Sequence, residues 1–191
     1  MAAYPYLVQI AWDTVNKFIE DWQREPYRWP RERDVQVELA SRISSVYRVI
    51  GHDTVLGNYD DAVAGFEGNQ RWNRVSCEHT LAYTYENGEK YRCHPDIIIW
   101  DDIENPDLPP DVDWESNWPI LWLCEVKLEG QQEENWDIKK MNYLLTQGDA
   151  KYACWLNLLF KRAESGDSIT WKNPFKNKKL WLCTAMLPPL K

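Results

Sequence analysis

Two short apolar segments that carry charged residues at one end constrain this chain most strongly. The first is residues 97–100, which follow Asp96 directly, and the second is residues 120–127. Both have the length and apolar content of buried β-strands. Glu125 and Lys127 are two residues apart and therefore project from the same face of a strand. Because a buried strand carries a charged group only where that group is paired or holds a metal, we expect Asp96, Glu125 and Lys127 to converge on a divalent-metal site.

The pattern Pro95-Asp96, followed by Glu125-Val126-Lys127, resembles the signature of the PD-(D/E)XK nuclease superfamily, the restriction-endonuclease-like proteins. The resemblance implies that Asp96 and Glu125 bind Mg²⁺, with Mn²⁺ as a substitute, and that the Val126 carbonyl adds a ligand. It also implies that Lys127 positions or activates the attacking water. The alternative is an ion pair at two strand ends on the protein surface.

Residues 31–50 predict a helix that ends at Gly51. Its apolar stripe comprises Val35, Leu39, Ile43, Val46 and Ile50. Glu38 lies at the edge of this stripe, one turn before Arg42, and has two interpretations. It is either an exposed partner of Arg42 or a further metal-binding, catalytic carboxylate. The resemblance favours the second, because superfamily members often bring a first-helix glutamate to the metal.

Apolar spacing and turn residues predict the remaining elements: a helix over 5–22, hairpin strands over 75–85 and 90–100, a helix over 131–147, and strands over 152–160 and 180–187. This order resembles the fold of the superfamily, an α/β class restriction-endonuclease-like α/β/α sandwich with a central mixed β-sheet. The resemblance covers roughly residues 31–160. We expect one nuclease-like domain, with an N-terminal helix extension (1–30), a catalytic core (31–160), and a basic loop with a C-terminal strand (161–191).

The hairpin turn Asn87-Gly88 sets the expected register of the two strands before the second acidic motif. If the turn has two residues, paired residue numbers sum to 175 and Asp96 lies opposite His79. His79, and His94 in the run His94-Pro95-Asp96, are therefore candidates to support the metal-binding carboxylate. A longer turn would shift this register.

The charge is unevenly distributed along the chain. The net charge is −8, which argues against a protein that coats nucleic acid non-specifically. Residues 53–135 carry 19 acidic and 5 basic side chains, whereas residues 161–191 carry 2 acidic and 7 basic ones. A basic rim beside an acidic centre would suit a phosphate backbone, although a patchy solvated surface explains the same pattern. The candidate nucleic-acid contacts are Arg71, Arg74, Lys139 and Lys140.

The segment from Arg71 to Arg74 mixes cations with Trp72 and could grip nucleic acid by stacking. It could equally be a loop anchored by a buried tryptophan. Residues 101–119 are acidic and proline-rich and predict a long loop between the motif strands.

Several classes of protein are excluded. The five cysteines show no C-x-x-C spacing, so a disulfide framework or a structural zinc site is not expected. No apolar run approaches the roughly 20 residues that cross a bilayer, and the first residues do not form a secretory signal. We therefore expect no membrane partner and a cytoplasmic location. A glycosidase, which also uses paired carboxylates, is a minor alternative.

Together these features predict a Mg²⁺-dependent DNA endonuclease. The alternative from another class is a catalytically silent, nuclease-like module that binds nucleic acid or a protein. DNA versus RNA and endonuclease versus exonuclease remain open. A homodimer is compatible with this function, because a monomer that nicks one strand needs a second copy to cut both.

Overall fold

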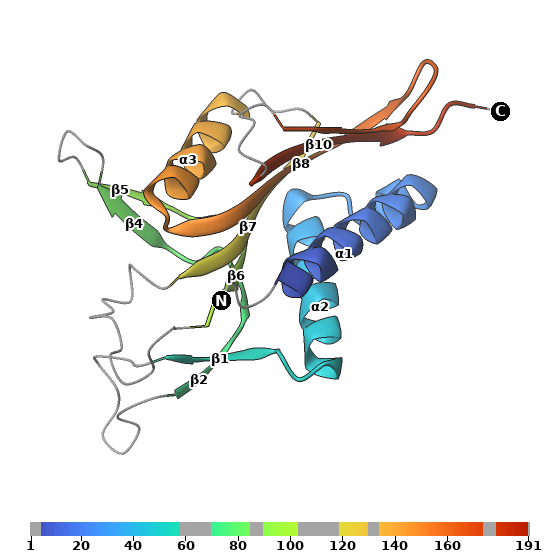
Figure 1. Ribbon diagram of the computed structural model, residues 1–191. Coiled ribbons are helices and arrows are strands. Elements are labelled where there is room, and N and C mark those ends of the chain that lie inside the picture. The colour runs from blue at the N-terminus through green and yellow to red at the C-terminus, as the bar shows by residue number, and fades with distance from the viewer. Residues whose placement is uncertain are drawn as a thin grey trace.

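A six-stranded mixed sheet forms the centre of the protein in a computed structural model (Figure 1), which describes residues 5–57, 70–84, 90–102, 119–129, 134–173 and 179–190. The strand order is β3 (Val75–Cys77), β6 (Ile97–Trp100), β7 (Ile120–Leu128), β8 (Ala150–Arg162), β10 (Leu180–Leu187) and β9 (Ile169–Lys172). The central pairs β7–β8 and β8–β10 are parallel, and the outer pairs are antiparallel. The expected α/β class with a mixed sheet is confirmed.

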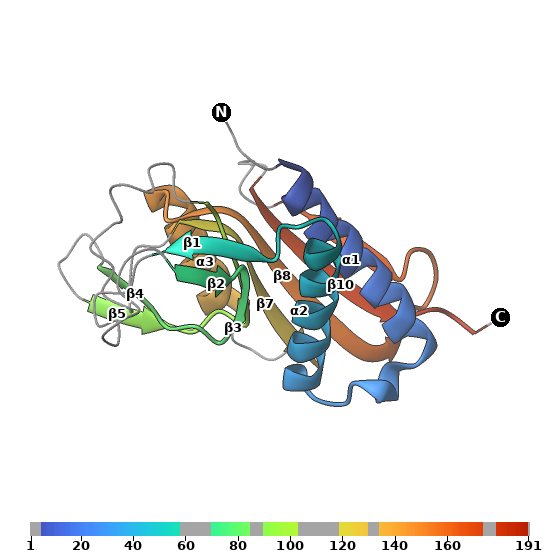
Figure 2. The same ribbon diagram turned by 90° about the horizontal axis from the view of Figure 1, so that it is seen from below.

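Helices cover both faces of this sheet. Figure 2 looks onto the layer formed by α1 (Pro5–Arg24) and α2 (Glu32–Val49), which pack side by side and are joined through the 3-10 helix η1 (Pro26–Arg28). The helix α3 (Glu134–Gln147) lies on the opposite face. Alternation along β7 separates the two cores, because Trp122, Cys124 and Val126 pack with α1 and α2, whereas Leu123 packs with α3.

The first helix belongs to the same core as the second. The apolar stripe of α1 is fully buried and comprises Leu7, Ala11, Val15, Phe18 and Trp22. Beyond this apolar contact, Gln23 Nε2 donates to Ser168 Oγ at 2.9 Å and to the Met186 carbonyl at 2.7 Å. The segment before residue 31 is therefore packed onto the sheet near β9 and β10.

The buried face of α2 departs from the predicted stripe at its C-terminal end. In α2, Val46 and Ile50 are each 39% exposed, and Tyr47 is buried in their place, with its hydroxyl donating to the Leu7 carbonyl at 2.7 Å. In α3, Trp136 is 52% exposed and Ile138 is buried. Tyr47 lies about 100° around the axis from Val46, and Ile138 about 200° from Trp136, so the apolar residues of a helix do not by themselves determine the face by which it docks.

The predicted hairpin exists in two pieces, with a different register. The strands β4 (Leu81–Thr84) and β5 (Lys90–Cys93) form one piece, and β3 pairs with β6 in the other. The pairs Val75–Ile99 and Leu81–Cys93 have residue numbers that sum to 174, not 175. The expected pairing of His79 with Asp96 is therefore wrong, and the Glu78 amide instead donates to the Asp96 carbonyl at 3.3 Å.

The register of both pieces is shifted by one residue from that of a two-residue turn at Asn87-Gly88, since Thr84 pairs with Lys90. The turn itself, within residues 85–89, lies outside the described residues. A further two-stranded sheet, β1 (Thr54–Gly57) with β2 (Gln70–Asn73), forms where irregular structure was expected. Most of the predicted acidic loop, residues 103–118, also lies outside the described part of the chain.

No described helix combines the length and the apolar character that crossing a membrane would require.

Candidate active site

Asp96 directly precedes β6. The described pairing of β6 with β7 ends at Ile97 and Cys124, so the next part of the β7 edge faces the Asp96 side chain. That carboxylate is buried, and its Oδ2 accepts a hydrogen bond from the Val126 backbone amide at 2.5 Å. Its Oδ1 accepts one from Gln36 Nε2 of α2 at 2.7 Å. The Asp96 carboxylate therefore accepts the Val126 amide in place of a backbone carbonyl of a neighbouring strand, and the two hydrogen bonds hold it in one orientation.

Glu125 and Lys127 extend from β7 on the face covered by α3. Glu125 is 2% exposed, and its Oε1 lies 2.6 Å from Lys140 Nζ. Lys127 is also buried, and its Nζ lies 3.3 Å from Asp137 Oδ2 and 3.5 Å from Glu32 Oε1. The three signature residues predicted from the sequence are therefore part of one buried polar cluster.

Four residues of this cluster were not predicted as part of the metal site. Glu32 and Gln36 are one turn apart on α2, and Asp137 and Lys140 are one turn apart on α3. Lys140 Nζ lies 3.3 Å from Asp137 Oδ1, so Asp137 contacts one ammonium with each oxygen. The signal for the second pair was present in the sequence, because both residues interrupt the apolar face of α3 that includes Met141 and Leu144.

Glu38 does not join this cluster in the way that the resemblance implied. Its Oε1 accepts a hydrogen bond from Arg42 Nε at 2.8 Å, and Arg42 also pairs with Asp21 of α1 at 2.6 Å. Glu38 follows Gln36 by two residues and so points to the other side of α2. The alternative interpretation, a glutamate paired with Arg42, is the one observed, and Gln36 is the α2 residue that contacts Asp96.

The two candidate histidines have other partners. The His79 ring packs edge-on against Trp100, with centroids 4.9 Å apart. His94 is exposed, and its Nδ1 lies 3.2 Å from Thr80 Oγ1. Neither contact involves Asp96 or Glu125.

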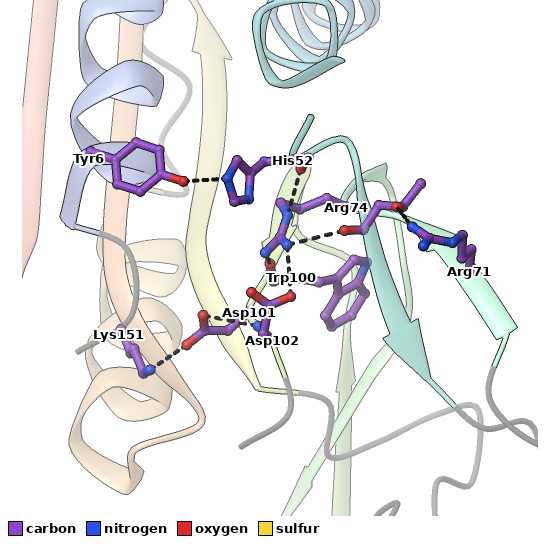
Figure 3. A network of polar contacts seen from close by, with 9 residues as sticks. Tyr6, His52, Arg71, Arg74, Trp100, Asp101, Asp102 and Lys151 are labelled. Atoms are coloured by element: carbon purple, nitrogen blue, oxygen red, sulfur yellow. Dashed lines mark hydrogen bonds and ion pairs between the residues drawn. The ribbon is translucent and has the colours of Figure 1, made fainter. Parts of the chain in front are cut away.

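Arg74 is a structural anchor and not a nucleic-acid contact, which corrects the prediction (Figure 3). Its guanidinium is buried and donates to the carbonyls of His52, Thr54 and Trp100 at 2.7, 3.1 and 3.0 Å. It also pairs with Asp102 Oδ1 at 2.8 Å. These bonds fasten the start of β1 to the end of β6.

The other three candidate contacts differ in exposure. Arg71 is exposed on β2 and donates to Thr54 Oγ1 at 3.2 Å (Figure 3). Lys139 is exposed on α3. Lys140 is buried between Glu125 and Asp137, so its predicted role as a surface contact is also corrected. Arg71 and Lys139 remain available on the surface for an anionic partner.

Burial and neighbouring charges perturb the titration of this cluster. Burial raises the pKa of both Asp96 and Glu125 above the ordinary carboxyl value, although Lys127 and Lys140 act in the opposite direction. For Lys127, burial lowers the pKa, but Asp137, Asp96, Glu32 and Glu125 together raise it above the ordinary lysine value. Lys127 is therefore an ammonium at neutral pH.

The oxygen donors of the cluster match the ligand chemistry of Mg²⁺, which prefers carboxylate and carbonyl oxygens. Glu125 Oε1 and Asp137 Oδ2 are buried, and each is in an ion pair with a lysine ammonium, 2.6 Å from Lys140 Nζ and 3.3 Å from Lys127 Nζ respectively. The Val126 amide faces Asp96, and the carbonyl of the same strand residue points to the same edge.

The side chains are not, however, arranged as a ready-made metal cage. Among the described residues, no group of three or more His, Cys, Asp or Glu side chains is placed to hold an ion. At Glu125, the Lys140 ammonium occupies the position that a metal ion would need. The donor set therefore fits Mg²⁺ chemically, and its geometry would have to adjust around Lys140.

Comparison with known proteins does not identify a family: no protein-family model, curated protein or solved structure matches this chain. The functional interpretation therefore depends on the geometry and chemistry of the cluster itself.

Proposed function

We propose that this protein is a Mg²⁺-dependent nuclease with a restriction-endonuclease-like α/β/α sandwich, and that it hydrolyses phosphodiester bonds in DNA. The observation that carries the proposal is the convergence of Asp96, Glu125 and Lys127 in one buried cluster where β6 and β7 separate. The order of the elements supports it as well. Around the central sheet, the order from α2 to β8 is a helix, the antiparallel strands β3, β6 and β7, the helix α3 and the parallel strand β8, with the strands of the two small sheets inserted between them; the resemblance implies such an order.

In this function, Asp96, Glu125 and the Val126 carbonyl would hold the metal. Bound Mg²⁺ supplies Lewis-acid chemistry at a phosphoryl oxygen and makes a bound water more acidic. Gln36 fixes the orientation of Asp96 through its 2.7 Å hydrogen bond, and so limits the movement of one metal ligand.

Lys127 would act as a fixed cation. Its surrounding carboxylates hold its pKa above the ordinary value, so it donates hydrogen bonds at neutral pH and is not a base in this state. A positioned ammonium stabilises the negative charge that develops on the phosphoryl group and orients the attacking water. Glu32 and Asp137 position the ammonium by contacting it at 3.5 and 3.3 Å.

One observation favours the alternative, a nuclease-like binding module without turnover. The cluster supplies its own cations, since Lys140 contacts Glu125 and Lys127 contacts Asp137, and a protein with no metal requirement could keep such an arrangement. In that case the exposed basic side chains, such as Arg71 and Lys139, would contact a nucleic-acid backbone without cleavage.

A cleavage assay separates these functions. The protein is incubated with linear, circular and single-stranded DNA and with RNA, in Mg²⁺, Mn²⁺ or EDTA. We expect metal-dependent cleavage by the wild type, loss of cleavage in Asp96→Asn and Glu125→Gln, and full cleavage in the control Glu164→Gln, which changes an exposed carboxylate distant in sequence from the cluster. Cleavage that persists in EDTA, or in both cluster variants, would contradict the proposal.

A further inference from the structure

Lys140 is a buried lysine that contacts a proposed metal ligand. It extends from α3, is 7% exposed, and places its Nζ 2.6 Å from Glu125 Oε1. The same ammonium donates to Asp137 Oδ1 at 3.3 Å. Its neighbour Lys139 is exposed on the same helix. The chain therefore carries two adjacent lysines, of which one neutralises the cluster and the other faces solvent.

The contact with Glu125 is a close ion pair. Glu125 is buried, and the Lys140 ammonium 2.6 Å from its Oε1 compensates its charge. A carboxylate that has lost its water retains a strong affinity for a cation. The position that Lys140 occupies is thus one that a metal ion could also satisfy.

Lys140 and a metal ion cannot use the same oxygen at once. Mg²⁺ binds carboxylate oxygens at about 2.0–2.1 Å and requires near-octahedral geometry, which leaves no room for an ammonium 2.6 Å from Oε1. Asp137 offers the displaced ammonium a second position. It lies one turn before Lys140 on the same helix and already accepts its hydrogen bond, so a rotation of the lysine side chain suffices.

We propose that Lys140 is an internal counter-ion, which occupies the cation position at Glu125 in the metal-free protein and which a divalent metal displaces toward Asp137. This inference rests on the proposed function to the extent that it takes Glu125 as a metal ligand. It explains how carboxylates as deeply buried as Asp96 and Glu125 coexist without a metal. The metal affinity of the site then depends on competition between the Lys140 ammonium and the metal ion for Glu125. Asp137 is a positioning residue, because it holds the displaced ammonium.

The test compares Lys140→Gln with the matched control Lys139→Gln. Calorimetric titration with Mn²⁺ and with Mg²⁺ gives the affinity, and thermal unfolding in EDTA gives the metal-free stability. We expect Lys140→Gln to unfold at a lower temperature in EDTA and to bind Mn²⁺ at least about tenfold more tightly, since it lacks the competing charge. Lys139→Gln should match the wild type in both measurements.

Equal or weaker metal binding by Lys140→Gln overturns the inference, while metal-dependent cleavage by the wild type would leave the proposed function intact. If Lys140→Gln does not fold in EDTA, recovery of the fold on adding Mn²⁺ supports the inference and failure to recover overturns it. If neither the wild type nor the variant binds a metal, the inference and the metal-dependent function both fail. If the variant binds a metal but no form of the protein cleaves, the inference stands and the nuclease function fails.

Discussion

Asp96 and Glu125 are both buried carboxylates, but they are stabilised in different ways. Asp96 accepts hydrogen bonds from two neutral donors, the Gln36 amide and the Val126 backbone. Glu125 faces an ammonium. The neutral donors fix the orientation of the Asp96 carboxylate but do not compensate its charge. The Lys140 ammonium compensates the charge of Glu125 and obstructs one of its oxygens. At the residue scale, Asp96 is therefore the carboxylate with a fixed orientation, and Glu125 is the one that a cation already contacts.

Replacing Gln36 tests this difference. Gln36→Leu leaves Asp96 Oδ1 without its donor, and we expect a loss of about 1–3 kcal/mol in unfolding free energy, the usual cost of an unsatisfied buried polar atom, together with reduced cleavage. Glu38→Ala is the control on the same helix. It removes a partly exposed ion pair with Arg42, which is worth at most about 1 kcal/mol, and should leave cleavage unchanged.

Urea unfolding and the DNA cleavage assay measure both effects. The opposite result, an inactive Glu38→Ala beside a neutral Gln36→Leu, would return Glu38 to the metal site as the resemblance implied.

Lys127 distinguishes an enzyme from a binding module. We expect Lys127→Ala and Lys127→Arg each to lose cleavage by at least about a hundredfold, the usual scale for a positioned proton-transfer or charge-stabilising group. The larger, planar guanidinium cannot reproduce the compact contacts of the ammonium with Asp137 and Glu32. DNA affinity in Ca²⁺, measured by fluorescence anisotropy, should fall much less. A wild type that never cleaves, combined with weaker binding by Lys127→Ala, would instead support the binding module.

At the scale of elements, Arg74 joins parts of the chain that would otherwise lie side by side without a strong connection. Its four acceptors come from the segment that leads into β1 and from the end of β6. Asp96 directly precedes β6 at its other end. A residue that the sequence suggested as a nucleic-acid contact thus stabilises the strand that follows Asp96.

We expect Arg74→Ala to lower the unfolding free energy by about 3–5 kcal/mol, because it leaves several buried acceptors and the Asp102 carboxylate without their donor. Arg71→Ala changes an exposed arginine three residues earlier and should cost less than about 0.5 kcal/mol. Guanidinium chloride unfolding of both variants gives the comparison. A small loss in Arg74→Ala would mean that water replaces the guanidinium at these carbonyls.

The elements that the sequence predicts well are those determined by local pattern. The stripe of α1 and the limits of β10 need only their own apolar spacing. The register of β3 with β6 differs instead by one residue from the one that the Asn87-Gly88 turn predicts, and this difference places Glu78 rather than His79 opposite Asp96. In α2, Gln36 and Glu38 lie on either side of the buried stripe through Val35 and Leu39, and apolar spacing alone does not indicate which side faces Asp96.

At the scale of the whole molecule, the cluster combines residues from α2, β6, β7 and α3, which the three layers bring to one point (Figure 1). The signature residues on β6 and β7 could be predicted because charge inside an apolar strand is unusual in any context. Asp137 and Lys140 are unusual as charges on the apolar face of α3, but they belong to this site because α3 docks over β7, and that long-range contact has no local signature. The sequence therefore indicates the strand part of such a site more readily than the helix part.

The buried carboxylates should make the metal-free protein less stable as the pH rises. Burial is the main cause that raises the pKa of Asp96 to about 6 and of Glu125 to about 8 in the folded protein. The ordinary pKa values of these two groups are 3.8 and 4.5. Between the ordinary and the raised pKa of each carboxyl group, the folded state therefore binds more protons than the unfolded state. Stability is then highest near the lower limit and falls as the pH rises toward 8.

We expect urea unfolding in EDTA to show this decline between pH 5 and pH 8, on the order of a few kcal/mol, and Glu125→Gln to show a smaller one, since an amide does not ionise. Glu164→Gln, which changes an exposed carboxylate, should keep the wild-type dependence. The direction of the effect is decisive. If the attraction of Lys140 outweighed the burial of Glu125, the pKa of Glu125 would be lowered, and the protein would become more stable as the pH rises. A wild type whose stability is constant or rises over this range would mean that the Lys140 contact outweighs the burial of Glu125.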